Sequence, residues 1–302
     1  MKIVFFTEMG FQGKITRNHN NMRTEFAWMC ALNADHCPIG QIPSDKYDLG
    51  IVIIPKKNPD FKIEDIKLSC TKVAVMQEGP NWYWQDYDLA KQIWYFNILT
   101  TADIIYTHNK SDKKYYQGLT SHPDVRVMQS LMIEESIGEL NQEKRKGVII
   151  GGNFVSWYGG FDSFIIAQGF DNGIVHAPSM GRKQFGEEQL LHHLPYMSWK
   201  EWIHELNKFK YGIHLMRTHA AGTFALNCAY LGIPCIGYKG LDTQEICHPD
   251  ITVELGDLDS ARKIAIKLRN DEDFYLYCAE KCKHKYNNYF TEQKFLEQFK
   301  QN

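Results

Sequence analysis

The fold is decided by residues 211–237, which read Tyr211-Gly-Ile-His-Leu-Met-Arg-Thr-His-Ala-Ala-Gly-Thr-Phe-Ala-Leu-Asn-Cys-Ala-Tyr-Leu-Gly-Ile-Pro-Cys-Ile-Gly237. An apolar run at 211–216 leads into small residues, and a helical pattern follows from 223 to 231. Gly232 ends that pattern just before a second apolar run at 234–238. A strand, a tight turn, a helix and a second strand in this order form the repeating unit of a parallel α/β sheet.

The turn in this stretch has the features of an anion site. Ala220, Ala221 and Gly222 have little or no side chain, so a ligand can approach the backbone closely. The first N–H groups of a helix have no partner within the helix, and the helix dipole is positive at that end. Arg217 would add a positive charge beside the ligand. A turn in an α/β core that binds no ligand explains the same residues, and this alternative stays open.

The same alternation of short apolar runs and helix-length segments continues through both halves of the chain. In the first half it predicts strands at 2–7, 49–54, 72–77, 104–107 and 125–128, with helices at 23–32 and 87–100. In the second half it predicts strands at 147–153, 173–176, 211–216 and 234–238, with helices at 161–169, 199–209, 223–231 and 274–299. A charged stretch without aromatic residues, 134–146, is the best linker. We therefore expect domains at 1–140 and 141–302.

The turn and helix at 219–237 resemble the donor-binding segment of GT-B glycosyltransferases. The order of the second half is similar as well, with Gly151-Gly152-Asn153 after its opening strand, then a polar Gly181-Arg182-Lys183. The chain also resembles glycosyltransferases of T4-like phages. The resemblance implies two Rossmann-like domains facing a cleft, with a C-terminal helix that closes back onto the first domain.

The resemblance implies a transferase that moves a sugar from a nucleoside-diphosphate sugar to an acceptor hydroxyl, without a metal or another cofactor. Asn227 stands where many of these enzymes have an acidic residue for the donor ribose, so that contact is in doubt. Two Asp-x-Asp patterns, Asp86 to Asp88 and Asp257 to Asp259, match the metal motif of another glycosyltransferase class, but so short a motif recurs by chance. The implied donor-binding residues are Gly13, Arg182, Lys183, Arg217, His219, Gly222, Thr223 and Asn227.

The first half would bind the acceptor and supply a general base. Carboxylates and imidazoles at the carboxyl ends of parallel strands are suited to this role. They are Glu78 as the first choice, then Glu8 and His19, with His108 also placed there; a structural turn explains Glu78 equally well. The acceptor-binding predictions are Arg17 and Arg23 from a long polar loop, and Trp82 and Trp84, expected to be exposed and able to stack on a sugar or base.

The acceptor itself stays open between several classes. Hydroxymethylcytosine in double-stranded phage DNA is one, although the net charge of −2 requires a local basic patch for DNA contact. That patch would combine Lys110, Lys113 and Lys114 with Lys14, Arg17 and Arg23. The alternatives are a polysaccharide, lipid-linked or small-molecule acceptor, a nucleotide-sugar epimerase of the same fold, and a nucleotide-binding module without catalysis.

Composition also indicates in which cellular compartment the protein acts. No stretch has the eighteen or so consecutive apolar residues that a membrane helix needs, and the first residues do not match a signal peptide. The eight cysteines form no Cys-x-x-Cys pair, so we expect free thiols; Cys278, Cys282 and His284 are a weak alternative metal set. These features predict a cytoplasmic protein that does not bind membranes. They leave its oligomeric state open.

Overall fold

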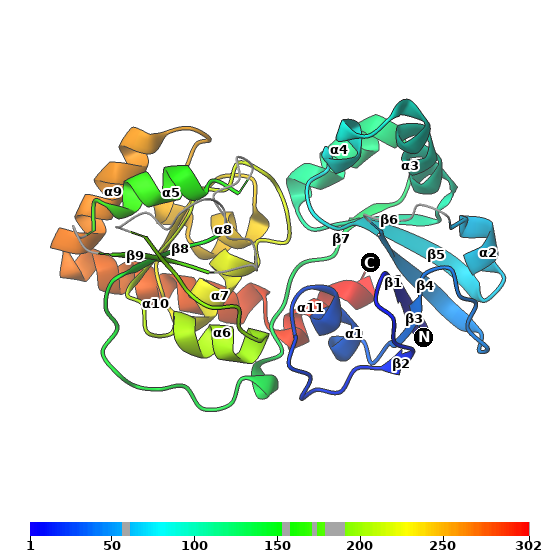
Figure 1. Ribbon diagram of the computed structural model, residues 1–302, viewed down its shortest axis with the longest axis horizontal. Helices are drawn as coiled ribbons and strands as arrows, with labels where there is room; N and C mark the ends of the chain where they lie inside the picture. Colours follow the sequence, from blue (N-terminus) through cyan, green and yellow to red (C-terminus); the bar gives the residue numbers. More distant parts are fainter. Residues whose placement is uncertain (56–60, 153–157, 171–173, 179–190, 302) are drawn as a thin grey trace.

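The computed structural model describes residues 1–55, 61–152, 158–170, 174–178 and 191–301. Within them the chain forms two sheets, each covered by helices (Figure 1). We call the part built on the first sheet, together with the C-terminal helix, the first lobe, and the part built on the second sheet the second lobe. The predicted α/β architecture of two mostly parallel sheets is confirmed.

The first sheet has seven strands in the order β2-β3-β1-β4-β5-β6-β7, parallel except for β2. Its central strands are apolar on both faces, as expected for a parallel sheet covered on both sides. Its elements are β1 (Ile3–Thr7), β2 (Gly13–Lys14), α1 (Glu25–Ala31), β3 (Asp35–Pro38), β4 (Tyr47–Ile54), α2 (Ile63–Lys67), β5 (Cys70–Gln77), α3 (Leu89–Thr101), β6 (Ile104–Thr107), α4 (Lys110–Thr120) and β7 (Val125–Val127).

The second sheet has six parallel strands in the order β10-β9-β8-β11-β12-β13. The capping box of α6, in which Ser198 and Glu201 bond each other's backbone, fixes where that helix begins. The elements are β8 (Val148–Ile150), α5 (Gly160–Ala167), β9 (Val175–Ala177), β10 (Leu191–His193), α6 (Trp199–Leu206), β11 (Tyr211–His214), α7 (Thr223–Leu231), β12 (Cys235–Tyr238), α8 (Asp242–Cys247), β13 (Thr252–Val253), α9 (Leu258–Asn270), α10 (Glu272–Tyr289) and α11 (Glu292–Gln301).

One apolar core runs through both lobes. It joins the face of the first sheet covered by α1 and α11 to the helices α6, α7 and α10 of the second lobe. The opposite face of the first sheet packs on α2, α3 and α4, and that of the second sheet on α5 and α9. The two lobes therefore share one apolar core, and the linker is not their only connection.

The C-terminal segment crosses back to the first lobe, as predicted. The stretch expected as one helix is two, α10 on the second lobe and α11 beside α1 (Figure 1). Phe299 of α11 stacks on Tyr106 of β6, with ring centroids 6.2 Å apart. The Glu292 carboxylate accepts two hydrogen bonds from the Arg17 guanidinium, at 3.0 and 2.6 Å.

No helix in the described ranges is both long and apolar enough to cross a bilayer. All eight cysteines are free thiols and all are buried.

Candidate functional site

The main cavity lies between the lobes and has a volume of about 460 Å³. It is lined from both sheets at the carboxyl ends of their strands, which is where ligands of open α/β sheets bind. Glu78 follows β5 and His108 follows β6, while Gly152 follows β8 and His214 ends β11. The other described residues that line it are Arg23, Thr24, Gly79, Pro80, Tyr83, Tyr158, Pro178, Pro195, Met197, Trp202, Met216, Ala220, Ala221, Gly222, Thr223, Phe224 and Asn227.

The start of α7 faces this cavity, as predicted from the turn. Gly222, just before the helix, has a φ of 65°, the left-handed region that glycine adopts most easily. A Cβ at Gly222 would lie 2.1 Å from Thr243 Oγ1, and that hydroxyl donates to the Gly222 carbonyl at 2.9 Å. Among the described residues, no side chain caps the start of this helix. Its first N–H groups are therefore free to meet an anion in the cavity.

Arg23 lines the same cavity from the first lobe. Its guanidinium donates to the Met197 carbonyl at 3.4 Å, and no acidic side chain in the described ranges forms an ion pair with it. Burial lowers the pKa of Arg23 because the cation loses hydration without gaining a counter-charge. A half-buried cation without a partner is costly unless a ligand supplies the negative charge.

The other loop arginine is used differently. Besides the bonds to Glu292, Arg17 Nε donates to the Glu135 carboxylate at 2.6 Å. These two carboxylates hold the pKa of Arg17 above its usual value. Arg17 does not line the described cavity, so the structure corrects its prediction as an acceptor-binding residue: its guanidinium is taken up by the contact between the polar loop and α11.

Of the three predicted catalytic residues, the structure brings Glu78 to the cavity. The Gln77 side chain donates to the Glu78 carbonyl at 2.7 Å and accepts from the Trp84 indole at 2.7 Å, which fixes the loop after β5. Tyr83 lines the cavity beside it, and burial, the hydrogen bond with Tyr87 and nearby carboxylates raise its pKa to about 12.

Glu8 and His19 are exposed and are not among the described lining residues. Glu8 comes directly after β1, whereas the His19 ring stacks on Phe26 with centroids 4.8 Å apart. Gly13, a predicted donor residue, lies on the edge strand β2, where it pairs with His36 of β3, outside the described lining.

The predicted tryptophans are arranged differently from the expectation. Trp84 is only 2% exposed and packs against Tyr95 and Trp94. It is a core residue that holds the loop of Glu78, so it is not available to stack on an acceptor. Trp82 is half-buried and does not line the cavity in its described part.

Two predicted donor residues of the second lobe lie outside the described lining and are engaged by protein groups. Arg217 Nη2 pairs with Asp162 at 2.8 Å, and Tyr238 donates to the same carboxylate oxygen at 3.1 Å. His219 contacts Ser111 and Asp112 of the first lobe. The predicted residues Arg182 and Lys183 lie outside the described residues.

Asn227 lines the cavity, but its amide is also satisfied within the protein. In the orientation that suits its neighbours, the amide nitrogen donates to the Thr223 carbonyl at 3.1 Å and the oxygen accepts from Trp202 Nε1 at 3.0 Å. A contact from Asn227 to the donor ribose would therefore have to replace one of these two hydrogen bonds.

The two Asp-x-Asp patterns are helix starts. Asp88 accepts from the Lys91 N–H before α3, and Asp257 accepts from the Ser260 N–H before α9. No group of three or more histidine, cysteine or acidic side chains suited to a metal occurs in the described ranges. The expected independence from metal stays a prediction.

The predicted basic patch is divided. Lys14 lies on β2 and bonds Asn33, whereas Lys110, Lys113 and Lys114 lie on α4 at the opposite edge of the first sheet. Since Arg17 is paired with Glu135 and Glu292, and Arg23 faces the cavity, the six cations do not form one surface.

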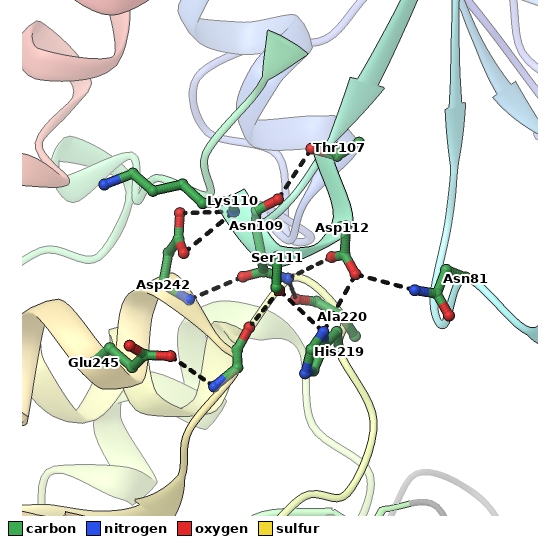
Figure 2. A network of polar contacts seen from close by, with 11 residues as sticks. Asn81, Thr107, Asn109, Lys110, Ser111, Asp112, His219, Ala220, Asp242 and Glu245 are labelled. Carbon is green, nitrogen blue, oxygen red and sulfur yellow. Dashed lines mark hydrogen bonds and ion pairs between the residues drawn. The ribbon is translucent and has the colours of Figure 1, made fainter. Parts of the chain in front are cut away.

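A polar cluster that the sequence did not predict joins the lobes beside the cavity (Figure 2). We call it the lobe contact and define it by Asn109, Ser111, Asp112, His219 and Asp242. The Asn109 amide donates to Asp112 and to the Ala220 carbonyl, both at 2.9 Å, and accepts from the Asp242 N–H at 2.9 Å. The Ser111 hydroxyl contacts His219 Nδ1 at 3.0 Å.

Known structures with a similar fold include glycosyltransferases. TarM has a TM-score of 0.63 at 8% identity over 84% of this chain, and this chain spans about half of TarM (54%). Anabaena HepE in complex with UDP and glucose has a TM-score of 0.64 at 10% identity, covering 100% of this chain and 98% of HepE. An alpha-glucosyltransferase in complex with UDP and a 13-mer DNA containing an HMU base has a TM-score of 0.64 at 14% identity, covering 99% and 98%.

No protein-family model matches the chain, and no curated protein matches it. At these identities the structural likeness shows the fold alone. The two parallel sheets, the cavity between their carboxyl ends and the returning C-terminal helix give this chain the fold of the GT-B glycosyltransferases.

Proposed function

We propose that this chain is a glycosyltransferase that transfers a sugar from a nucleoside-diphosphate sugar to an acceptor hydroxyl. The observation that carries the proposal is that the uncapped start of α7 and the unpaired Arg23 line one cavity. Both supply positive potential, and no carboxylate in the described ranges is paired with either of them. A diphosphate fits that environment. The UDP complexes of the similar structures support this donor class.

Arg23 and the N–H groups of α7 would stabilise the negative charge that develops on the leaving diphosphate. Such preorganised donors lower the barrier most when water is excluded, as in a cavity between two lobes. Glu78 is the carboxylate placed to assist at the acceptor hydroxyl or the sugar. Arg182 and Lys183 remain proposed donor contacts, and no metal is part of the proposal.

For the acceptor we propose hydroxymethylcytosine in DNA. The similar alpha-glucosyltransferase, solved with DNA containing an HMU base, supports a hydroxymethylated pyrimidine in DNA as the acceptor class. Of the predicted patch, the lysines of α4 are the cations that would contact DNA together, since the patch is divided. Such an acceptor implies action in the cytoplasm, and in the host cytoplasm for a phage enzyme.

The donor site is tested by calorimetric titration with UDP. We expect Arg23→Gln to weaken UDP binding about 30-fold, because about 2 kcal/mol of charge-assisted hydrogen bonding is lost. Arg17→Gln is the matched control, since that loop arginine pairs with Glu135 and Glu292 away from the cavity. Its UDP affinity should stay within about twofold of the original. Equal affinities for the original protein and Arg23→Gln would contradict the assignment.

The acceptor is tested by incubating the protein with UDP-glucose or UDP-N-acetylglucosamine and duplex DNA containing hydroxymethylcytosine. The nucleoside mass should rise by one sugar residue, and unmodified duplex should show no change. Sugar transfer to a polysaccharide or small alcohol but not to DNA would keep the enzyme class and reject the DNA acceptor. Conversion of the donor sugar without any acceptor would identify an epimerase instead.

A further inference from the structure

The outer side of α3 exposes three large apolar side chains. Leu89, Ile93 and Phe96 are 70%, 51% and 40% exposed, and we call them the α3 stripe. The opposite side of the helix, with Ile98, packs on the first sheet. All residues of α3 are described, and the other exposed ones are uncharged: Ala90, Asn97, Thr100 and Thr101. The exposed side of this helix therefore has no charge that would keep a second apolar surface away.

The surroundings of the α3 stripe differ from those of a single exposed apolar residue such as Ile266 of α9. Ile266 is 40% exposed, but the exposed residues around it include Arg262, Lys263 and Lys267. Single apolar side chains in a charged surface are common in soluble proteins. The α3 stripe instead continues for about 10 Å along one uncharged helix face. Continuous apolar surface is typical of an interaction site.

The spacing of the stripe is that of a short coiled-coil seam. Its positions follow one another at intervals of four, three and four residues: Leu89, Ile93, Phe96 and Thr100. In a heptad these are the positions d, a, d and a, which face a partner helix. A β-branched residue at a, here Ile93, with leucine at d favours two parallel helices. The stripe therefore matches a second copy of itself.

The two helices that flank α3 expose opposite charges. The strand order β4-β5-β6-β7 places α2 on one side of α3 and α4 on the other, over the same face of the first sheet (Figure 1). Glu64 and Asp65 of α2 are exposed, and so is Lys114 of α4; none of the three forms an ion pair within the described ranges. A two-fold axis along α3 brings α2 of one copy over α4 of the other, where these charges attract.

We propose that a second copy of this chain packs its α3 stripe against this one, with the two α3 helices parallel about a two-fold axis. Two-fold dimers, in which the same face of both copies pairs, are the commonest oligomers. A lipid surface fits less well, because helices that lie on membranes carry cations beside their apolar face. Lys91, the one charged residue of α3, is paired with Asp88 at 3.3 Å.

The dimer should be weak, because the contact is small. One face of α3 is about 20 Å long and about 10 Å wide, well below the area of about 800 Å² per partner that a stable interface buries. We therefore expect a dissociation constant of about 10 to about 100 µM. The pairing is independent of the proposed donor and acceptor. Lys110, whose N–H bonds Asp242 in the other lobe, is not needed for it.

The pairing is tested by sedimentation velocity of the whole chain from about 5 to about 300 µM, where the sedimentation coefficient should rise toward that of a dimer. Ile93→Asp places two carboxylates against each other at the seam and should weaken dimerisation at least about 30-fold. Its melting temperature should stay unchanged, because Ile93 is exposed in the single copy. Ile266→Asp is the matched control on α9 and should leave the dissociation constant within about twofold.

Charge exchange tests the direction of the two helices. Lys114→Glu should weaken dimerisation about threefold, since a like charge then faces α2 of the other copy. Adding Glu64→Lys to the same chain restores the attraction and should recover most of this loss. Antiparallel helices would place α4 against α4, so Glu64→Lys would recover nothing, and the parallel seam would be wrong.

Disulfide formation gives a second, independent measurement. All eight native cysteines are buried, so a thiol introduced on the surface pairs with the same thiol of a second copy. Ile93→Cys and Phe96→Cys should each give a covalent dimer under mild oxidation, and Ile266→Cys should not. If Phe96→Cys stayed monomeric, the helices would not be parallel and in register.

Three further results would overturn the proposal. They are a chain that stays monomeric up to about 300 µM, a dimer that Ile93→Asp leaves intact, and equal weakening by Ile93→Asp and Ile266→Asp. Vesicles of phosphatidylcholine and phosphatidylserine test the other occupant. Binding to these vesicles that Ile93→Asp abolishes, without a dimer in solution, would assign the α3 stripe to a lipid surface instead.

Discussion

The lobe contact (Figure 2) is bonded to Ala220, which also lines the cavity, and these two neighbouring regions have opposite hydrogen-bonding states. In the lobe contact, the Asn109 amide uses both its nitrogen and its oxygen, and the Asp242 carboxylate accepts from the Lys110 N–H at 3.2 Å. In the cavity, within the described ranges, Arg23 has no counter-charge and His214 has no hydrogen-bond partner. Paired polar groups therefore join the lobes, whereas these two side chains in the cavity keep unused hydrogen-bonding capacity, as the proposed ligand site requires.

The segment Ala220–Gly222 belongs to both regions. Its three carbonyls accept from Asn109 at 2.9 Å, from the Ser130 hydroxyl at 2.7 Å and from the Thr243 hydroxyl at 2.9 Å. The same segment lines the cavity just before α7. Because the carbonyls are fixed by the rest of the protein, the backbone that leads into the uncapped helix is held in one orientation before a ligand arrives.

The largest expected effect on stability is in the segment Ala220–Gly222, which belongs to both regions. Gly222→Ala adds a Cβ that would lie 2.1 Å from Thr243 Oγ1, at a φ of 65° that alanine rarely adopts. We expect a loss of about 3 kcal/mol in the free energy of unfolding, measured by urea denaturation.

Gly256→Ala is the control for backbone strain alone, because Gly256 also has a positive φ, 84°, but no atom within 4 Å of an added Cβ. It should cost about 1 kcal/mol. If both variants lost the same unfolding free energy, packing against Thr243 would not be what holds the segment Ala220–Gly222 in place.

A smaller effect is expected within the lobe contact. Asn109→Ala removes three hydrogen bonds and leaves the Asp242 N–H and the Ala220 carbonyl without this partner. We expect a loss of about 2 kcal/mol in unfolding free energy, together with weaker UDP binding as the lobes separate.

Asn141→Ala, at an exposed asparagine whose side chain accepts from the Glu143 N–H in its own loop, is the control and should cost less than about 0.5 kcal/mol, because the bond from Asn207 to the Asn141 backbone carbonyl is kept. If Asn109→Ala lost as little unfolding free energy as this control, the paired groups of the lobe contact would not hold the lobes together. The proposed difference between the lobe contact and the cavity would then be wrong.

The sequence predicted the positions of the strands better than it predicted which face of a helix is buried. Apolar runs such as 49–54 have few ways to be buried other than as central strands, so their prediction is confirmed. In α3, however, apolar residues lie on two sides. Leu89, Ile93 and Phe96 are 70%, 51% and 40% exposed, whereas Tyr95 and Ile98 lie in the core. Periodicity alone did not decide between these faces, because only the packing against the sheet does.

The candidate site shows the same limit. The structure places Glu78, Gly222, Thr223, Asn227 and Arg23 around the cavity, all named from sequence, although Arg23 was expected at the acceptor. His214 also lines the cavity and was not named from the sequence, where it lies within the apolar run at 211–216. A histidine at the carboxyl end of a buried strand was the available signal. That Arg17 is paired depends on Glu135 and on Glu292 of α11, which lie far away in the chain.

The smallest effect concerns the pH dependence of the lobe contact. The hydrogen bond to Asp112, opposed by burial, raises the pKa of His219 above its usual value of 6.5. A raised pKa in the folded state means that protonated His219 favours folding, so its contribution is complete below pH 6.5 and is lost as pH rises through the raised pKa.

Since the His219 side chain is 34% exposed, solvent screening keeps the contribution of its charge to stability small. The melting temperature of the original protein should exceed that of His219→Gln by about 2 °C more at pH 6 than at pH 8.5. A gap that did not vary with pH would mean that the charge of His219 plays no part in joining the lobes. In that case the neutral hydrogen bonds of Asn109 and Ser111 would account for the contact, and the two regions would differ in pairing but not in charge.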